Sequence, residues 1–418
     1  MKSHYDTPAS QRTEQPTDID VERYESILES VLDYARERSY CGWDYGDGMS
    51  SRVLQAVPFE NKWLNIAVQE LAKRPPINLR PLLLVEQRRN YKGTALFTMA
   101  NLNAAHLDIG PTDVDYAGEA HALAEWLVEN ESVGYPGFCG GHNHQIQLLS
   151  GRGHPNDPDV VSTSYAVKAL LATEELDDSF PSVAKTAANV LEETLNYRSV
   201  DDGAIINYHL NHSDDSTTIN ANALGARLLT DLYARFGREA DRQKAESILN
   251  YVASRQTDPG GWYYRDPPSD SHLSMDNHHN AFIIESFLRY REVCDSSAFE
   301  DVLDLALDFY RNQLFSSDGA PNFDEENAYP RDVHAAANGI LIFTYAGDHE
   351  FAARIIDWTV ENLSAGKGTF YFRKQRFYTK RHILMRWCQA WMAFALSEFL
   401  TSLDRDTDRT DHRLVRSN

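Results

Sequence analysis

The sequence predicts an all-α protein with an (α/α)6 toroid fold, in which six helical hairpins close into a ring with an inner and an outer layer. Two observations support this prediction. A loop rich in glycine and aromatic residues recurs about every fifty residues, and such a period is typical of repeat architectures. Between these loops, helices that are apolar on nearly all sides alternate with helices that are polar on one face, as two concentric layers require.

The amphipathic helices are expected to form the outer layer. Residues 21–38 are typical of them, because Leu28, Val31, Leu32 and Ala35 recur at three- and four-residue spacing with charged residues in between. The other amphipathic segments are residues 63–73, 116–128, 183–195, 240–255, 299–314 and 351–363.

The expected inner helices are apolar around most of their circumference, which is typical of helices buried on most sides. They are residues 96–107, 160–172, 219–233, 279–290, 333–345 and 383–400. A shorter inner segment near residues 50–57 allows for a seventh hairpin. Strand signals are few, and residues 204–208 and 369–373 are expected to form small β-hairpins in the loops.

The main alternative architecture is an open solenoid of the tetratricopeptide type. Those repeats are shorter, about 34 residues, and lack long aromatic loops. An open superhelix also needs a polar terminal cap, whereas residues 386–396 are among the most apolar of the chain. We therefore expect one closed toroid domain over residues 19–402, with disordered polar tails at 1–18 and 403–418.

Composition limits the class of partner. The chain has 62 acidic and 40 basic residues, for a net charge of −22. This charge disfavours nucleic acid and anionic membranes as partners and suits a protein of a high-salt cytosol. The four cysteines form no metal-binding pair, and we find neither a signal peptide nor an apolar stretch of about 20 residues. The sequence predicts a cytoplasmic protein without an integral membrane segment.

In a toroid, the long loops and the starts of the inner helices meet at one end, where helix N-termini favour anionic ligands. Candidate substrate-binding residues in the first loop are Asp44, Tyr45 and Asp47. The two carboxylates could take part in acid–base chemistry, and turn formation or capping explains them equally well.

A second group of candidates follows a Gly-Gly pair. His142 and His144 have the spacing of a zinc-binding pair, but no third ligand stands at a suitable distance, so no metal is predicted. We expect these imidazoles to contact a sugar or to transfer protons. Tyr208, in the next loop, could supply a hydroxyl group.

The run Asp276-Asn-His-His279 opens an inner helix. Helix capping accounts for only one of its four residues, which leaves His278 and His279 as candidates for proton transfer. Adjacent helical residues point about 100° apart, so one of the two is expected to face the ring axis. In the preceding loop, Trp262 and Tyr264 are candidate substrate contacts.

The last two loops contribute cationic groups. Arg331 and His334 are one helical turn apart, so both could face the cavity, although Arg331 could instead pair with Asp332. Arg373, Arg386 and Trp387 complete the candidate site. Guanidinium groups bind carboxylates in a bidentate manner, and a buried arginine is costly unless it meets an anion.

Five motifs recur at the loops and at the starts of the inner helices: Trp-Asp-Tyr-Gly-Asp at 43–47, Gly-Phe-Cys-Gly-Gly at 137–141, Asp-Asn-His-His at 276–279, Tyr-Pro-Arg-Asp-Val-His at 329–334 and Met-Arg-Trp-Cys-Gln-Ala-Trp at 385–391. With these motifs, the chain resembles over residues 20–402 a family of α/α-toroid proteins associated with glycan assembly, whose archaeal branch includes the N-glycosylation component archaeal glycosylation protein Q. More distantly, the chain is similar to N-acylglucosamine 2-epimerases and uronyl hydrolases. The resemblance implies a role in preparing or remodelling a sugar of a lipid-linked glycan.

The first hypothesis is therefore a cofactor-independent sugar isomerase or epimerase, acting on a hexuronic acid during glycan assembly. Such a reaction needs proton-transfer groups on both faces of the sugar and cations beside the enediolate. His278 or His279, together with His144 or His334, would supply the first, and Arg331 and Arg386 the second. A lipid-linked oligosaccharide is an expected substrate, and membrane-bound glycosyltransferases are expected transient partners.

Two alternatives remain open. A hydrolase or lyase acting on uronyl oligosaccharides would need a carboxylic acid at the scissile bond, with Asp44, Asp47 and Asp276 as candidates. A non-catalytic glycan-binding protein would need only the aromatic residues of the loops.

Overall fold

A computed structural model describes residues 19–56, 61–110, 113–147, 152–210 and 216–416 of the chain. Six helices form the inner ring: α4 (Tyr91–His106), α6 (Val160–Ala172), α9 (Ile219–Phe236), α11 (Asn277–Cys294), α13 (Val333–Tyr345) and α15 (Trp391–Arg416). Each of them packs against the next in this order, and α15 packs against α4. The ring is therefore closed, and the predicted six-hairpin toroid is confirmed.

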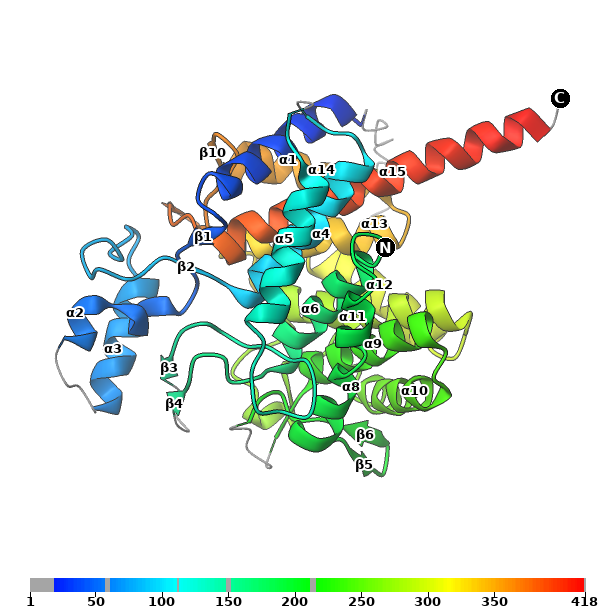
Figure 1. The fold of residues 1–418 in the computed structure, drawn as a ribbon, viewed down its shortest axis with the longest axis horizontal. Helices are drawn as coiled ribbons and strands as arrows, with labels where there is room; N and C mark the ends of the chain where they lie inside the picture. Colours follow the sequence, from blue (N-terminus) through cyan, green and yellow to red (C-terminus); the bar gives the residue numbers. More distant parts are fainter. Residues whose placement is uncertain (1–18, 57–60, 111–112, 148–151, 211–215, 417–418) are drawn as a thin grey trace, which may run out of the picture.

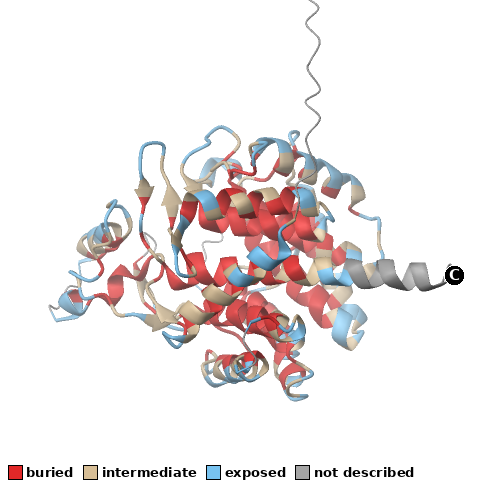
Figure 2. Ribbon diagram, turned by 90° about the horizontal axis from the view of Figure 1, so that it is seen from above, coloured by how far each residue is buried: buried red, intermediate tan, exposed pale blue. Residues whose placement is uncertain are grey.

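The outer layer packs on this ring (Figure 1). It consists of α1 (Val21–Arg36), α5 (Tyr116–Glu129), α7 (Phe180–Ala184), α8 (Ala187–Asn189), α10 (Glu239–Ala253), α12 (Glu300–Gln313) and α14 (His349–Leu363). In Figure 2, buried residues fill the central helices and exposed residues lie at the periphery. The expected outer helix at 183–195 is divided in the structure into α7, α8 and the π-helical turn Val190–Thr194.

Four inner helices begin at an acidic or amide cap. The side chains of Asn90, Asp159, Asp276 and Asp332 each accept a hydrogen bond from a backbone N–H in the first turn of their helix. Such caps satisfy donors that have no partner within the helix. They also place carboxylate and amide groups at the end of the ring where the long loops lie.

Short antiparallel ladders stabilise these loops. The pairs are β1 (Cys41–Gly42) with β2 (Arg88–Arg89), β3 (Ile146–Gln147) with β4 (Arg152–Gly153), β5 (Arg198–Val200) with β6 (Gly203–Ile205), β7 (Thr217–Thr218) with β8 (Arg265–Asp266), and β10 (Ser364–Gly366) with β11 (Thr369–Phe370), while β12 (Arg373–Lys374) lies between β9 (Arg331–Asp332) and β13 (Thr379–Lys380). These ladders match the expectation of small hairpins within the loops.

The segment expected to open a seventh hairpin does not join the ring. Helix α2 (Arg52–Gln55) is a single turn that packs on the 3-10 turn Asp47–Ser50, and residue 57 lies outside the described residues. Helix α3 (Lys62–Lys73), expected in the outer layer, packs on the same turn and on β3. Both helices stand to one side of the ring in Figure 1.

The two ends of the chain differ from each other. The expected tail at 1–18 lies outside the described residues. At the other end, α15 continues to Arg416, although a disordered tail was expected from residue 403 onwards. All four cysteines are free. Among the described helices, none combines the length and the apolar character that crossing a bilayer requires.

Candidate active site at the mouth of the ring

The mouth of the ring is the end where the inner helices begin. Asp276, the cap of α11, holds both histidines that follow it. The Nδ1 atom of His279 lies 2.8 Å from the nearer carboxylate oxygen of Asp276, and Nδ1 of His278 lies 3.1 Å from the other. Burial alone would raise the pKa of Asp276, but the neighbouring imidazoles hold it below its usual value. An ionised Asp276 thus accepts from His279, and its charge lies beside His278.

His334 lies next to this pair. Its ring centroid is 5.0 Å from that of His278, 4.6 Å from Trp387 and 4.5 Å from Trp391. Both ring nitrogens of His334 are buried without a hydrogen-bond partner among the described residues. Burial, together with the neighbouring His278 and Lys92, lowers the pKa of His334 well below its usual value. His334 is therefore neutral at pH 7.

Trp387 is held in place by Asp332, the cap of helix α13. Its Nε1 donates to Asp332 at 2.9 Å, and the same carboxylate pairs with Arg373 and accepts from the backbone of His334. Tyr45 packs on Trp387 with ring centroids 4.7 Å apart. Trp387 lies in the π-helical turn Met385–Ala390, and turns of this kind are frequent at functional sites.

Arg386, from the same turn, anchors the first loop. Its Nε donates to Asp44 at 2.8 Å, and Asn90 donates to the same carboxylate oxygen at 2.9 Å. Burial would raise the pKa of Asp44, but Arg386 and the nearby histidines hold it below its usual value. Both partners are almost fully buried, so this ion pair joins the first loop to the last helix inside the mouth.

His142 and His144 form a second wall of the mouth, with ring centroids 5.4 Å apart. Burial lowers the pKa of His144 to about 4 and that of His142 well below its usual value. One nitrogen of each ring is buried without a hydrogen-bond partner among the described residues. A cavity of about 150 Å³ adjoins this wall and is also lined by Asp159 and Tyr208.

Lys92, in the first turn of α4, stands between the two walls. Its positive charge lowers the pKa of His142 in one wall and of His278 and His334 in the other. Burial and the nearby Arg386 in turn lower the pKa of Lys92 itself. The sequence does not single out Lys92, because a lysine at the start of an apolar helix does not reveal which way its side chain points.

Asp159 is a second residue of the mouth that the sequence does not single out. It caps α6, lies in the wall of the 150 Å³ cavity, and has a pKa that burial raises above the usual value of a carboxyl group. An aspartate before an apolar helix is usually only a cap, so the sequence pattern does not separate the two roles.

Three predicted residues do not reach the mouth. Trp262 is 1% exposed, stacks on Phe287 and donates to the carbonyl of Val252, so it belongs to the core between α10 and α11. Arg331 points to Trp358 of the outer helix α14, and its expected partner Asp332 binds Arg373 instead.

Asp47 is the third of these residues. Its carboxylate binds the buried Arg80 at 2.7 Å and accepts from the backbone N–H of Asp44. It therefore stabilises the conformation of the first loop. Burial raises the pKa of Asp47 to about 6 in spite of this arginine. Tyr264, by contrast, lies at the mouth, with its ring 4.5 Å from that of His279.

Asp276, His278 and His279 also form a group whose ligand atoms lie within 4.8 Å of one another, close enough to share a metal ion. However, both Nδ1 atoms are at hydrogen-bond distance from the Asp276 carboxylate. The carboxylate accepts from His279 and lies beside His278, so it orients these rings for proton transfer as well as it could join them in binding an ion.

Similar folds are found among solved structures. A cellobiose 2-epimerase from Bacillus thermoamylovorans is 13% identical, with 91% of this chain and 98% of that one covered and a TM-score of 0.63. An unsaturated glucuronyl hydrolase from Streptococcus agalactiae is 12% identical (96% and 98% covered, TM-score 0.59), and a sugar epimerase from a ruminal bacterium is 16% identical (76% and 90% covered, TM-score 0.56). No protein-family model and no curated protein sequence matches this chain. These likenesses establish the α/α-toroid fold.

Proposed function

We propose that the protein is an enzyme that isomerises or epimerises a sugar, and that His278 and His334 carry the proton transfer. The observation that supports this proposal most is the meeting of these two imidazoles beside Lys92 and Arg386. Epimerases and a uronyl hydrolase among the proteins of similar fold are consistent with a sugar substrate.

The reaction begins with removal of a proton from a carbon next to a carbonyl or carboxylate group. A neutral imidazole is required for this step, and burial keeps His278 and His334 neutral at pH 7. The negative charge that develops on the sugar oxygen is stabilised by Lys92 and Arg386. Return of a proton to the same carbon or its neighbour completes the isomerisation, with His142 or His144 serving the opposite face.

We further propose that the substrate is a hexuronic acid of a lipid-linked glycan, and that the enzyme works in the cytoplasm. The cationic groups of the mouth suit a carboxylate, because guanidinium and ammonium groups form charge-assisted hydrogen bonds with it. In a deletion strain, mass and stereochemical analysis of the glycan should reveal a lost or inverted sugar. Glycans unchanged by the deletion would contradict this role.

The proton-transfer proposal is tested by solvent deuterium uptake at a sugar carbon, followed by NMR. We expect His278→Ala and His334→Ala each to lower the rate by about 10²–10⁴-fold, the usual contribution of a positioned acid or base. His121→Ala, on the outer helix α5, is the matched control and should retain the wild-type rate. Sugars that bind wild-type protein without any exchange would instead indicate a glycan-binding protein.

A second function, cleavage of uronyl oligosaccharides by hydrolysis or by the elimination reaction of a lyase, is favoured by one observation. The raised pKa of Asp159 suits a general acid, and this carboxyl group lines the cavity next to His142 and Tyr208. Asp44 and Asp276, two of the candidates that the sequence offers for this role, have lowered pKa values and are poor acids. An assay for new reducing ends, with Asp159→Asn as the inactive variant, separates this function from isomerisation.

A further inference from the structure

A second, larger cavity lies at the opposite end of the ring, where the inner helices end. It has a volume of about 750 Å³, within the range of about 300–1,000 Å³ that is typical of ligand sites. Its wall is formed by residues of five inner helices: α6, α9, α11, α13 and α15. We call it the lower chamber.

An aromatic layer separates the lower chamber from the mouth. Tyr165, Phe282 and Trp391 are buried, and their ring centroids lie 5.2–6.2 Å apart. On the mouth side, the ammonium group of Lys92 lies 5.5–5.8 Å from all three rings. On the other side, the hydroxyl of Tyr165 donates to Glu285 at 2.9 Å, and Glu285 belongs to the wall of the lower chamber.

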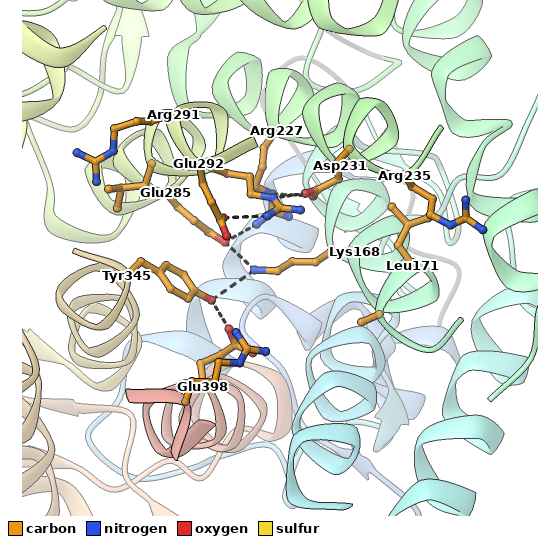
Figure 3. A pocket seen from close by; sticks show the side chains of 15 residues that line it. Lys168, Leu171, Arg227, Asp231, Arg235, Glu285, Arg291, Glu292, Tyr345 and Glu398 are labelled. Carbon is orange, nitrogen blue, oxygen red and sulfur yellow. Dashed lines mark hydrogen bonds and ion pairs between the residues drawn. The ribbon is translucent and has the colours of Figure 1, made fainter. Parts of the chain in front are cut away.

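The wall of the lower chamber contains a buried polar network (Figure 3). Glu285 accepts from Arg227 at 2.6 Å and from Lys168 at 3.1 Å. Lys168 also lies 3.4 Å from the hydroxyl of Tyr345, which donates to Glu398 at 2.8 Å. Buried charges do not usually stabilise a core better than apolar groups do. A polar network on the axis of a helical ring is therefore better explained by a ligand than by folding.

Two polar atoms of this wall have no hydrogen-bond partner among the described residues. They are the buried Nε of Arg227 and Oδ2 of Asp231, which meet only each other in a long ion pair of 4.0 Å. Arg227 is 1% exposed and lies in the middle of α9, so compensation of a helix end does not account for it. A buried polar atom without a partner is rare, and an unfilled ligand site is one explanation for it.

The charge of the wall indicates the class of ligand. Its cationic residues are Lys168, Arg227, Arg235, Arg289, Arg291 and Arg405. Its anionic residues are Asp231, Glu285, Glu292 and Glu398. The wall itself thus holds six cations and four anions, and the partly exposed Glu174 and Glu300, which pair with Arg235 and Arg291, lie outside it. An anionic group inside the chamber can interact with this excess of cations in the wall, and the carboxylates and Tyr345 can bind hydroxyl groups.

We propose that the lower chamber is a second binding site, separate from the mouth, for a sugar that carries a phosphate or a carboxylate group. Lys168, Arg289 and Arg291 bind the anionic group, while Glu398 and Tyr345 bind hydroxyls. The site does not depend on the reaction proposed for the mouth.

Isothermal titration calorimetry with glucose 6-phosphate, glucuronate and glucose tests this proposal. We expect one or both anionic sugars to bind and glucose to bind at least tenfold more weakly; the order of the two anions distinguishes phosphate from carboxylate recognition. Arg289→Gln should weaken binding about tenfold or more. If the Arg289→Gln protein fails to fold, Arg291→Gln, at a slightly more exposed position, takes its place in the experiment. Arg242→Gln, a paired arginine on the outer helix α10, is the matched control and should bind as the wild type does.

Three results would overturn the proposal. The first is equal binding of glucose and the anionic sugars, and the second is no binding of any of them at millimolar concentration. The third is loss of binding in His278→Ala together with unchanged binding in Arg289→Gln, because the anion would then occupy the mouth.

Discussion

Single ion pairs hold the mouth together, and the pair of Asp44 with Arg386 is the most consequential of them. It connects residues 342 positions apart in the chain, and both side chains are almost fully buried. Removing one member of a buried pair leaves the other charge without compensation, which is far more destabilising than loss of an exposed pair.

Asp44→Asn is therefore expected to lower the free energy of unfolding by about 3–5 kcal/mol, the range typical of a broken buried pair. Asp357→Asn breaks the ion pair with Arg23, in which both side chains are exposed. This change should lower the free energy of unfolding by less than about 1 kcal/mol. Urea denaturation at pH 7 measures both values. Similar losses in the two variants would contradict the assignment of Asp44 as a buried anchor.

The buried histidines make stability depend on pH. The pKa of His144 falls from 6.5 in the unfolded chain to about 4 in the folded protein, so between these values the unfolded state binds more protons. Stability is then complete above about pH 6.5 and is lost progressively as the pH falls towards 4.

His144→Gln should flatten this dependence by up to about 1.4 kcal/mol for each pH unit in that window. Urea denaturation at pH 8.5, 7.5, 6.0 and 5.0 measures the difference in slope between variant and wild type. The two slopes should coincide above pH 7, which serves as the internal control. Parallel curves over the whole range would show that His144 titrates normally in the folded protein.

The sequence predicted most of the individual residues of the mouth, since His278, His334, Arg386 and Asp44 all stand where a loop meets an inner helix. It did not predict Lys92, because a lysine within an apolar helix gives no indication of which way it points. Loop position predicts Trp262 at the mouth, and the spacing of one helical turn from His334 predicts Arg331 there. Only packing decides that the first enters the core and the second faces α14.

At the level of the elements, close backbone contacts position the loop that carries His142 and His144. A Cβ atom at Gly141 would lie 1.8 Å from the carbonyl oxygen of Asp157, which is far closer than any real contact. The loop therefore adopts this path only with glycine at that position. Gly141 also forms a bridge to Pro158, immediately before the Asp159 cap of α6.

Gly141→Ala is expected to destabilise the protein by about 1–3 kcal/mol and to lower activity by displacing His142. Gly153→Ala is the matched control in the same pair of loops. Its Cβ would meet only the carbonyl oxygen of Ile146, at 3.8 Å, so we expect a change within about 0.5 kcal/mol. Thermal unfolding and the deuterium exchange assay measure both effects. A Gly141→Ala protein with wild-type stability and activity would contradict the requirement for glycine at this position.

Periodicity predicted the order and the type of the helices, and it failed where local geometry departs from a regular α-helix. The segment expected as one outer helix at 183–195 contains three short pieces, and a π-helical turn precedes α15. Both departures depend on backbone hydrogen bonds that shift by one residue, and a pattern of apolar residues does not reveal such a shift.

Over the whole molecule, the acidic surface is the dominant electrostatic feature. A net charge of −22 destabilises the compact state through self-repulsion, and salt screens this repulsion. We expect the midpoint of thermal unfolding to rise between 0.1 M and 2 M KCl. A midpoint that is unchanged or falls with added KCl would argue against adaptation to a high-salt cytosol.

The aromatic layer has a consequence for the route that any substrate takes. Tyr165, Phe282 and Trp391 block the axis of the ring, so a polymer cannot thread through the molecule from one face to the other. Whatever enters the mouth must leave by the same opening. A long glycan can then reach His278 and His334 only from the face on which the mouth opens.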